Sequence, residues 1–271
     1  MKIDILFLDL DKTLLDNEHR LSQINRKALE AMGKKGIIRV IATGRSLFSF
    51  EKLCDKDLDV DYLIFSTGAG IINFKTKKTL MEKHLSEIKT KKAAELLISA
   101  RVNFMIHEPI PDNHNFIYWK CNVNVPDFER RLELYKGQAR ELKYHNKIGK
   151  SSQLVAIFNH DEMEKFAAIQ AALSDFKVIR TTSPLDHCSY WMEIFPLGVS
   201  KGHAAVWLTS YLGLSKDFTA SIGNDYNDLD LLLWTKFSFV VENAPKELKQ
   251  QFTVVAANDE GGFSQLLEHI K

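Results

Sequence analysis

Short, strongly apolar runs alternate with an amphipathic segment over the first fifth of the chain. The runs occupy residues 3–9, 37–43 and 62–67, and each has the length of a buried strand. Between the first two, Ser22 is suited to cap a helix in which apolar residues recur at helical spacing over 24–32. This strand-helix-strand rhythm predicts a parallel sheet with helices on both faces.

The middle of the chain follows a different pattern, with longer and half-polar strands. In residues 115–125 the odd positions, from Ile117 to Val125, would form one face of a strand, and the even positions, from Phe116 to Asn124, the other. Strands of this kind are typical of a sheet with one solvated face. We expect helices near 86–101 and 161–174 beside them.

The rhythm of short apolar runs and helices returns at Gly198. We therefore expect an α/β fold, a Rossmann-like three-layer core with a parallel sheet, formed by residues 1–82 and 195–271. Residues 83–194 would be an inserted α+β domain.

Composition narrows the class of protein. The 271 residues are 45% hydrophobic, and 36 Lys and Arg against 35 Asp and Glu give a net charge of +1. This balance argues against a dedicated nucleic-acid binder, which needs a basic surface. Without a run of 18 apolar residues we expect no membrane span. Three scattered cysteines without metal-binding spacing predict reduced thiols in a cytoplasmic protein. Nothing in the pattern indicates the oligomeric state.

Two carboxylates, Asp9 and Asp11, follow the first apolar run. Side chains at the carboxyl end of a strand point into the crevice where open α/β sheets bind their ligands. Mg²⁺ prefers such oxygen ligands, and one carboxylate could attack phosphorus while the other handles the proton. The alternative is a solvated loop with a helix cap.

Two further segments suit an anion. Thr43, Gly44 and Arg45 follow the second run, where a hydroxyl, a close backbone approach and a helix N-terminus favour phosphate. Lys201 lies in the first turn of an expected helix, where the helix dipole disfavours a cation unless an anion faces it. The alternatives are an ordinary strand end and a surface lysine.

An acidic turn follows the strand expected to end at Gly223. Asn224, Asp225, Asn227 and Asp228 crowd this turn, and its carboxylates repel one another unless a cation or base is present. The alternative is an acidic, well-capped helix N-terminus. All four segments lie at strand ends or helix starts, and their joint occurrence favours one site over four unrelated loops.

In this order the segments resemble the motifs of the haloacid dehalogenase superfamily of phosphohydrolases. DLDKT resembles the first motif, DxDxT, while IATGR, SKG and GNDYND resemble the second, the lysine and the acidic motifs. The intervals, together with TGAGI and VVENAPKELKQ, are similar to the Cof-type branch, which has a C2B cap between the second and third motifs. The resemblance implies a phosphoric monoester hydrolase with Mg²⁺ as cofactor.

The resemblance also implies roles for single residues. Asp9 would be the nucleophile and a Mg²⁺ ligand. Asp11 would protonate the leaving oxygen and then activate water, with its backbone carbonyl on the metal. Lys201 would take part in catalysis as well as binding. The phosphate oxygens would be held by the Leu10 amide, Thr43, Gly44, Arg45, Lys201 and Asn227.

Two positions depart from the family's pattern. Lys12 replaces the usual Gly, which restricts the backbone of the loop and adds a cation near the mouth of the site. Asn224 replaces the carboxylate that normally binds the metal directly. Asn224 and Asp225 are therefore alternatives for that role, with Asp228 in support.

By the same resemblance the cap selects the substrate, and its size favours a small phosphorylated metabolite such as a sugar phosphate. Residues 116–124 and 187–191 are candidates to contact the leaving group, unless their aromatic residues belong to the cap core. Three other functions stay open: a phosphomutase or phosphotransferase, a phosphate-accepting receiver, and a non-catalytic phosphate-binding protein. Asp11 and the inserted domain speak against the receiver.

Overall fold

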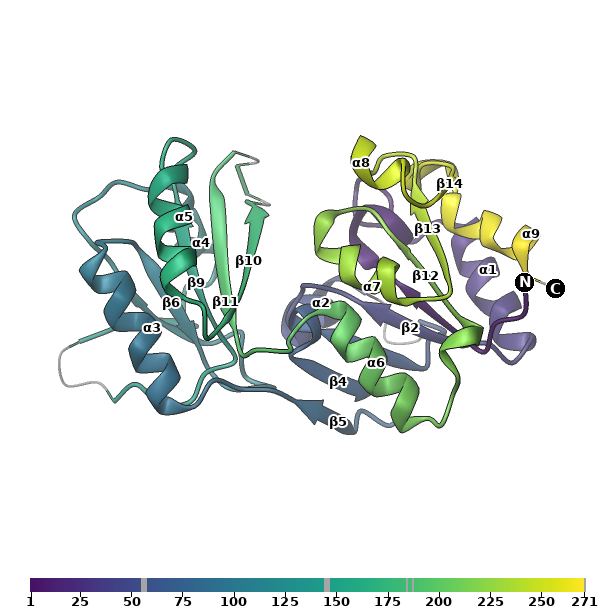
Figure 1. Ribbon diagram of the computed structural model, residues 1–271, viewed down its shortest axis with the longest axis horizontal. Coiled ribbons are helices and arrows are strands. Elements are labelled where there is room, and N and C mark those ends of the chain that lie inside the picture. Colours follow the sequence, from purple (N-terminus) through teal and green to yellow (C-terminus); the bar gives the residue numbers. More distant parts are fainter. Residues whose placement is uncertain (55–57, 144–146, 184, 187, 271) are drawn as a thin grey trace. The chain divides into compact units, whose positions relative to one another are not determined.

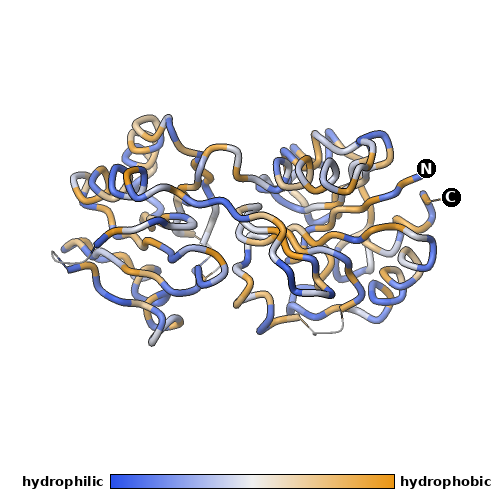
Figure 2. The backbone as a smooth tube through the Cα atoms, turned by 90° about the horizontal axis from the view of Figure 1, so that it is seen from below, coloured by the Kyte–Doolittle hydropathy of each residue, from blue (hydrophilic) through white to orange (hydrophobic). Residues whose placement is uncertain are grey.

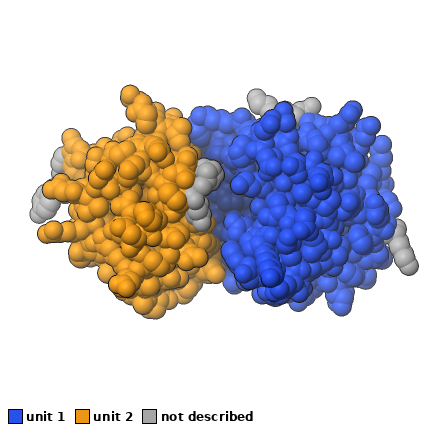
Figure 3. All heavy atoms as spheres, turned by 90° about the horizontal axis from the view of Figure 1, so that it is seen from above, with its two compact units in different colours: residues 1–82, 200–271 blue, residues 83–199 orange. Residues whose placement is uncertain are grey.

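The computed structural model describes residues 1–54, 58–143, 147–183, 185–186 and 188–270. The chain divides into two units, which Figure 1 shows as ribbons and Figure 3 as spheres. Unit 1 comprises Met1–Glu82 and Ser200–Lys271, and unit 2 comprises Lys83–Val199. The sequence placed the second boundary slightly earlier, after residue 194.

Within the described residues, unit 1 is built on an eight-stranded sheet with the order β14-β13-β12-β1-β2-β3-β4-β5. Neighbours are parallel from β14 to β3, and β4 and β5 are antiparallel. The strands are β1 (Ile5–Leu8), β2 (Ile38–Ala42), β3 (Tyr62–Phe65), β4 (Gly70–Asn73), β5 (Thr79–Glu82), β12 (Thr219–Gly223), β13 (Phe237–Val241) and β14 (Thr253–Val255). The three predicted apolar runs thus form β1, β2 and β3.

Helices cover both faces of this sheet, which confirms the predicted three-layer core (Figure 1). On one face, Ala204 of α6 and Leu231 of α7 pack against Ile5 and Val40. On the other lies α1, whose N-cap Ser22 accepts a hydrogen bond from the first turn as predicted. The helices of unit 1 are α1 (Gln23–Lys34), α2 (Leu47–Leu53), α6 (Lys201–Tyr211), α7 (Leu229–Trp234), α8 (Lys246–Lys249) and α9 (Leu266–His269).

The strand order brings three strand ends together. β1 lies between β12 and β2, all three parallel, so Asp9, Thr43 and Gly223 emerge at the same edge of the sheet. The chain continues to one side of β1 through β2 and β3, and later returns on the other side through β12. Such a reversal opens a crevice at the carboxyl ends of the strands, where α/β proteins bind ligands.

Unit 2 has its own six-stranded sheet among the described residues, with the order β10-β11-β9-β6-β7-β8. All pairs are antiparallel except β7 with β8. Its strands and helices are α3 (Glu87–Ser99), β6 (Phe104–His107), β7 (Phe116–Trp119), α4 (Pro126–Leu134), β8 (Ala139–Glu141), β9 (Gln153–Phe158), α5 (Met163–Ala172), β10 (Lys177–Thr182) and β11 (Tyr190–Phe195). In Figure 2, hydrophobic stretches alternate with hydrophilic ones along both units, as elements buried on one side require.

The strand predicted over 115–125 is shorter in the structure. It ends at Trp119, because the chain then turns toward α4 and Asn103 Oδ1 accepts a hydrogen bond from the Cys121 amide at 2.8 Å. Ile117 packs against the core that α3 and α5 cover. The opposite face is not simply polar, since Phe116 is fully buried and belongs to the core under α4.

None of the helices in the described residues is both long and apolar enough to cross a membrane.

Candidate active site

The first carboxylate is anchored directly after β1. The Asp9 amide donates to Ile222 O of β12 at 3.0 Å, which ties the residue to the neighbouring strand. The chain then forms one tight turn, Leu10–Leu14, from which Thr13 Oγ1 donates to Asp9 Oδ2 at 2.9 Å. Asp9 is 5% exposed, so its carboxylate is largely withdrawn from water.

Lys201 joins this carboxylate to the acidic turn. Its Nζ donates to Asp9 Oδ1 and to Asp228 Oδ1, each at 2.6 Å, and its side chain is fully buried. Lys201 is the first residue of α6, directly after the N-cap Ser200. The unfavourable position against the helix dipole is therefore offset by two carboxylates. We call Asp9, Lys201 and Asp228 the lysine bridge.

Asp228 also shapes the acidic turn. Its Oδ2 accepts hydrogen bonds from the amides of Asn224 and Asp225 at 3.0 and 3.2 Å. A Cβ on Gly223 would lie 2.6 Å from this oxygen, so the approach needs glycine. Asp225 is exposed and its Oδ1 accepts from the Tyr226 amide at 2.7 Å, an N-capping contact.

The lysine bridge perturbs the pKa values of its members. Burial, and next the neighbouring Asp228, raise the pKa of Asp9 to about 7, although Lys201 opposes them. Burial alone would lower the pKa of Lys201, but Asp228 and Asp9 together raise it above its ordinary value. Asp9 therefore lies in a place where additional positive charge would favour its ionised form.

Asp11 points to a different partner. Arg45 donates from Nε to Asp11 Oδ2 at 2.7 Å and from Nη2 to Asp11 Oδ1 at 2.6 Å, a bidentate pair. His19 Nδ1 lies 3.2 Å from the same Oδ1. The sequence predicted Arg45 as a phosphate ligand and did not predict either contact. His19 carried no motif signal, since it lies in an irregular loop.

The remaining predicted residues line the same edge. Thr43 is buried, and its Oγ1 accepts from the Arg45 amide at 3.1 Å. Among the described residues, a Cβ on Gly44 would meet only Thr67 Oγ1, at 3.6 Å, which leaves space beside this backbone. Asn227 Oδ1 is buried and has no hydrogen-bond partner among the described residues. Leu10 is buried at the base of the loop.

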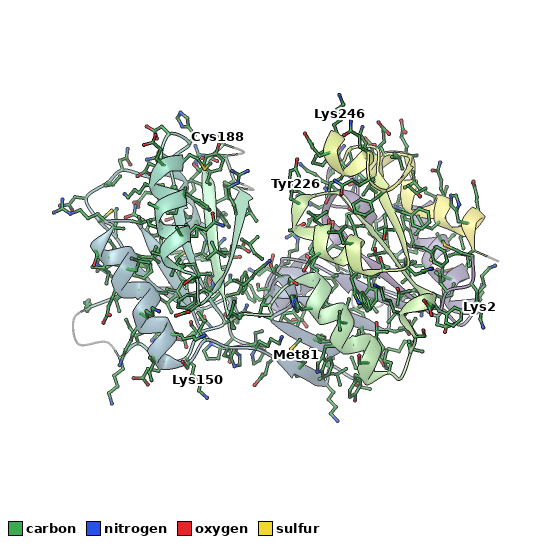
Figure 4. All side chains as sticks on the ribbon, in the orientation of Figure 1. Lys2, Met81, Lys150, Cys188, Tyr226 and Lys246 are labelled. Carbon is green, nitrogen blue, oxygen red and sulfur yellow. The ribbon has the colours of Figure 1, made fainter. Side chains whose placement is uncertain are left out.

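The aromatic residue of the acidic turn faces outward. Tyr226, labelled in Figure 4, lies in the short turn of residues 226–228 that precedes α7. It is 53% exposed, and its hydroxyl donates to Glu247 Oε2 at 3.0 Å. This contact joins the acidic turn to α8.

A sequence model of the haloacid dehalogenase-like hydrolases matches residues 6–267. The chain belongs to this family. It is similar to two Bacillus subtilis proteins named 5-amino-6-(5-phospho-D-ribitylamino)uracil phosphatase. YwtE is 26% identical over 97% of this chain and 96% of the relative, and YcsE is 24% identical over 98% and 95%. As a member of the family, the chain is a hydrolase.

Solved structures of haloacid dehalogenase enzymes share the fold. The phosphatase BT1666 from Bacteroides thetaiotaomicron has a TM-score of 0.80 at 21% identity, over 99% of this chain and 95% of that one. The subclass IIB sugar phosphatase BT4131 has a TM-score of 0.77 at 20% identity, over 98% of each chain. At these identities the likeness establishes the fold.

The donor atoms of this hydrolase fit a hard cation. The described residues contain no group of three His, Cys, Asp or Glu side chains poised to hold a metal. Mg²⁺ does not need one, because it keeps several waters and binds one or two carboxylates together with substrate phosphate. Asp9 supplies a carboxylate oxygen of the right kind at this edge, and Asn224, half-buried beside Asp228, supplies an amide oxygen.

Proposed function

We propose that this hydrolase is a Mg²⁺-dependent phosphatase that cleaves a small phosphate monoester, such as a sugar phosphate, through an aspartyl-phosphate on Asp9. The lysine bridge is the observation that carries the proposal. In it a buried carboxylate and a buried ammonium lie 2.6 Å apart, at the edge of the sheet where β2 also ends and is followed by Thr43 and Gly44, which we propose bind the phosphate. YwtE, YcsE and BT4131 are named phosphatases, which supports the same reaction class.

The reaction takes two steps. An Asp9 oxygen attacks phosphorus in line with the leaving oxygen, and Asp11 gives that oxygen its proton as the ester bond breaks. Asp11, now a carboxylate, then takes a proton from water, which attacks phosphorus and releases inorganic phosphate and free Asp9. Lys201 and the amides of the two loops stabilise charge on the equatorial oxygens. Mg²⁺, held by Asp9, the Asp11 carbonyl and the acidic turn, would supply further neutralisation.

The direct test is phosphate release from a panel of sugar phosphates, nucleotides and an aryl phosphate, with and without Mg²⁺. We expect release that needs Mg²⁺ and is lost in Asp9→Asn. Tight phosphate binding without turnover by the folded protein would instead indicate a binding protein. Transfer of the phosphoryl group to a sugar hydroxyl would indicate a phosphotransferase.

Asn224, rather than Asp225, is our choice for the direct metal ligand from the acidic turn. The Asp225 carboxylate is exposed and caps Tyr226, whereas Asn224 is half-buried beside Asp228. Asn224→Ala should raise the Mg²⁺ concentration for half-maximal activity by about tenfold, the lower range for loss of a metal-site partner. Asp225→Asn should leave it within about twofold. Mg²⁺ titrations of the two variants compare them, and the reverse ranking would make Asp225 the ligand.

Arg45 is expected to act as a positioning residue for Asp11. Arg45→Lys retains a cation but loses the bidentate geometry. Turnover of an alkyl phosphate should fall by about tenfold or more, because its leaving oxygen needs the proton from Asp11. The first step with an aryl phosphate should change much less, since an aryl oxygen leaves without protonation. First-step rates, measured for each substrate in a single turnover, that fall equally would contradict a role through Asp11.

A further inference from the structure

The residue between Asp11 and Thr13 has an unusual backbone. Lys12 has φ 55° and ψ 23°, the left-handed region that glycine adopts freely and residues with a Cβ adopt at a cost. A glycine would therefore be the relaxed choice at this position. The lysine must be explained by its side chain or be neutral for function.

The turn around Lys12 is fixed by other residues. Asn243 Nδ2 donates to Lys12 O at 2.9 Å, and Asn243 Oδ1 accepts from the Asn258 amide at 3.1 Å. Asn258 Nδ2 in turn donates to Leu15 O at 3.0 Å. Because these contacts involve only the backbone of the turn, they would hold the same conformation with another residue at position 12.

Exposure to solvent increases along the turn toward Lys12. Along the turn, Leu10 is fully buried, the Asp11 side chain is 33% exposed, and Lys12 is exposed. The phosphoryl group would lie against the Leu10 amide, and the leaving group beyond Asp11, which donates the proton. Because Lys12 follows Asp11 directly and is exposed, we take its flexible four-carbon side chain to extend toward the leaving group.

Lys12 differs from the two other cations named at the site in its ion pairs. Lys201 is bound to two carboxylates and Arg45 to a third. In the parts of the chain that the structure describes, the Lys12 ammonium forms no ion pair. A cation in this position can meet an anionic group of the substrate without first giving up a partner.

We propose that Lys12 is a specificity-determining residue that favours phosphate esters whose leaving group carries a second anion, a carboxylate or another phosphate. The inference rests on the proposed phosphatase function. It predicts a preference within pairs of compounds that share a carbon skeleton and differ in that second anion. Because the ion pair would form at an exposed site, the effect on kcat/KM should be about fivefold.

The test compares kcat/KM for 3-phosphoglycerate against glycerol 3-phosphate, and for fructose 1,6-bisphosphate against fructose 6-phosphate. The first pair tests a carboxylate and the second a phosphate. In at least one pair, Lys12→Gln should lower kcat/KM about fivefold for the compound that carries the second anion, mainly through a higher KM. The partner compound and an aryl phosphate should change less than twofold. Lys12→Arg should restore the preference.

A matched control separates charge from backbone strain. Lys77, in the turn between β4 and β5, has φ 57° and is remote in sequence from the site motifs. Lys12→Gly and Lys77→Gly each replace a lysine in the left-handed region by the residue that adopts this conformation freely. The unfolding temperature of each variant should be at most a few degrees below that of the parent protein. Only Lys12→Gly should reduce the preference for the second anion.

Three results would overturn the proposal. One is an equal loss for every ester in Lys12→Gln, which indicates general steering of anions. Another is unchanged kinetics in Lys12→Gln, and the third is a loss of preference in Lys77→Gly as well. Failure of the proposed function is distinguishable from all three, because the parent protein would then release phosphate from none of the compounds.

Discussion

Lys201→Gln should abolish most of the activity and destabilise the fold at the same time. The substitution removes a buried ammonium from between Asp9 and Asp228, which are 5% and 0% exposed. Breaking a buried ion pair on one side costs about 3–5 kcal/mol, because the remaining charge is uncompensated. Loss of one charged donor to the transferring phosphoryl group should reduce kcat by about 10²–10³. Urea denaturation and phosphate release measure the two effects.

The double variant Lys201→Gln with Asp228→Asn separates these effects. It removes one of the two facing carboxylates, so it should recover a large part of the lost free energy of unfolding. Its activity should stay low, because the ammonium is still absent. Equal stability of the single and double variants would contradict the account of the lysine bridge, as would full activity in either.

Asp11→Asn should slow the two chemical steps unequally. General acid and base catalysis contributes about 10²–10⁴ in rate, so turnover of alkyl phosphates should fall by that order. With an aryl phosphate the first step needs no proton donor, whereas hydrolysis of the aspartyl-phosphate still needs a base. We therefore expect a rapid burst of aryl alcohol, up to one equivalent per enzyme, and then slow turnover.

The control for this experiment is Asp217→Asn, an exposed carboxylate of unit 1 in the turn that follows α6. We expect steady turnover without a burst in this variant and in the parent protein, because the second step does not limit the rate of either. A steady, uniformly slow rate in Asp11→Asn, with no burst, would contradict the role of Asp11 as base.

The sequence predicted the core of unit 1 because its strands are buried on both faces. Such strands appear as short apolar runs, and β1 is buried at all four positions. Parallel order then brings the strand ends to one edge, so residues directly after the runs could be grouped without coordinates. Asp9, Thr43 and the acidic turn were found in this way.

Contacts between distant side chains could not be predicted in the same way. The pair of Arg45 with Asp11 depends on where a loop directs a long side chain, and His19 reaches Asp11 from an irregular segment. In unit 2 the alternation of residues 116–124 indicated one solvated face, but α4 covers part of that face and buries Phe116. His187, in the second predicted contact segment, lies outside the described residues.

The measurement closest to the central claim is mass analysis of Asp11→Asn protein mixed with an aryl phosphate and quenched in acid during the burst. The account predicts one added phosphoryl group on the peptide that contains Asp9, and none when Asp9→Asn is introduced as well. A burst that leaves Asp9 unmodified, or a phosphoryl group on another residue, would contradict it.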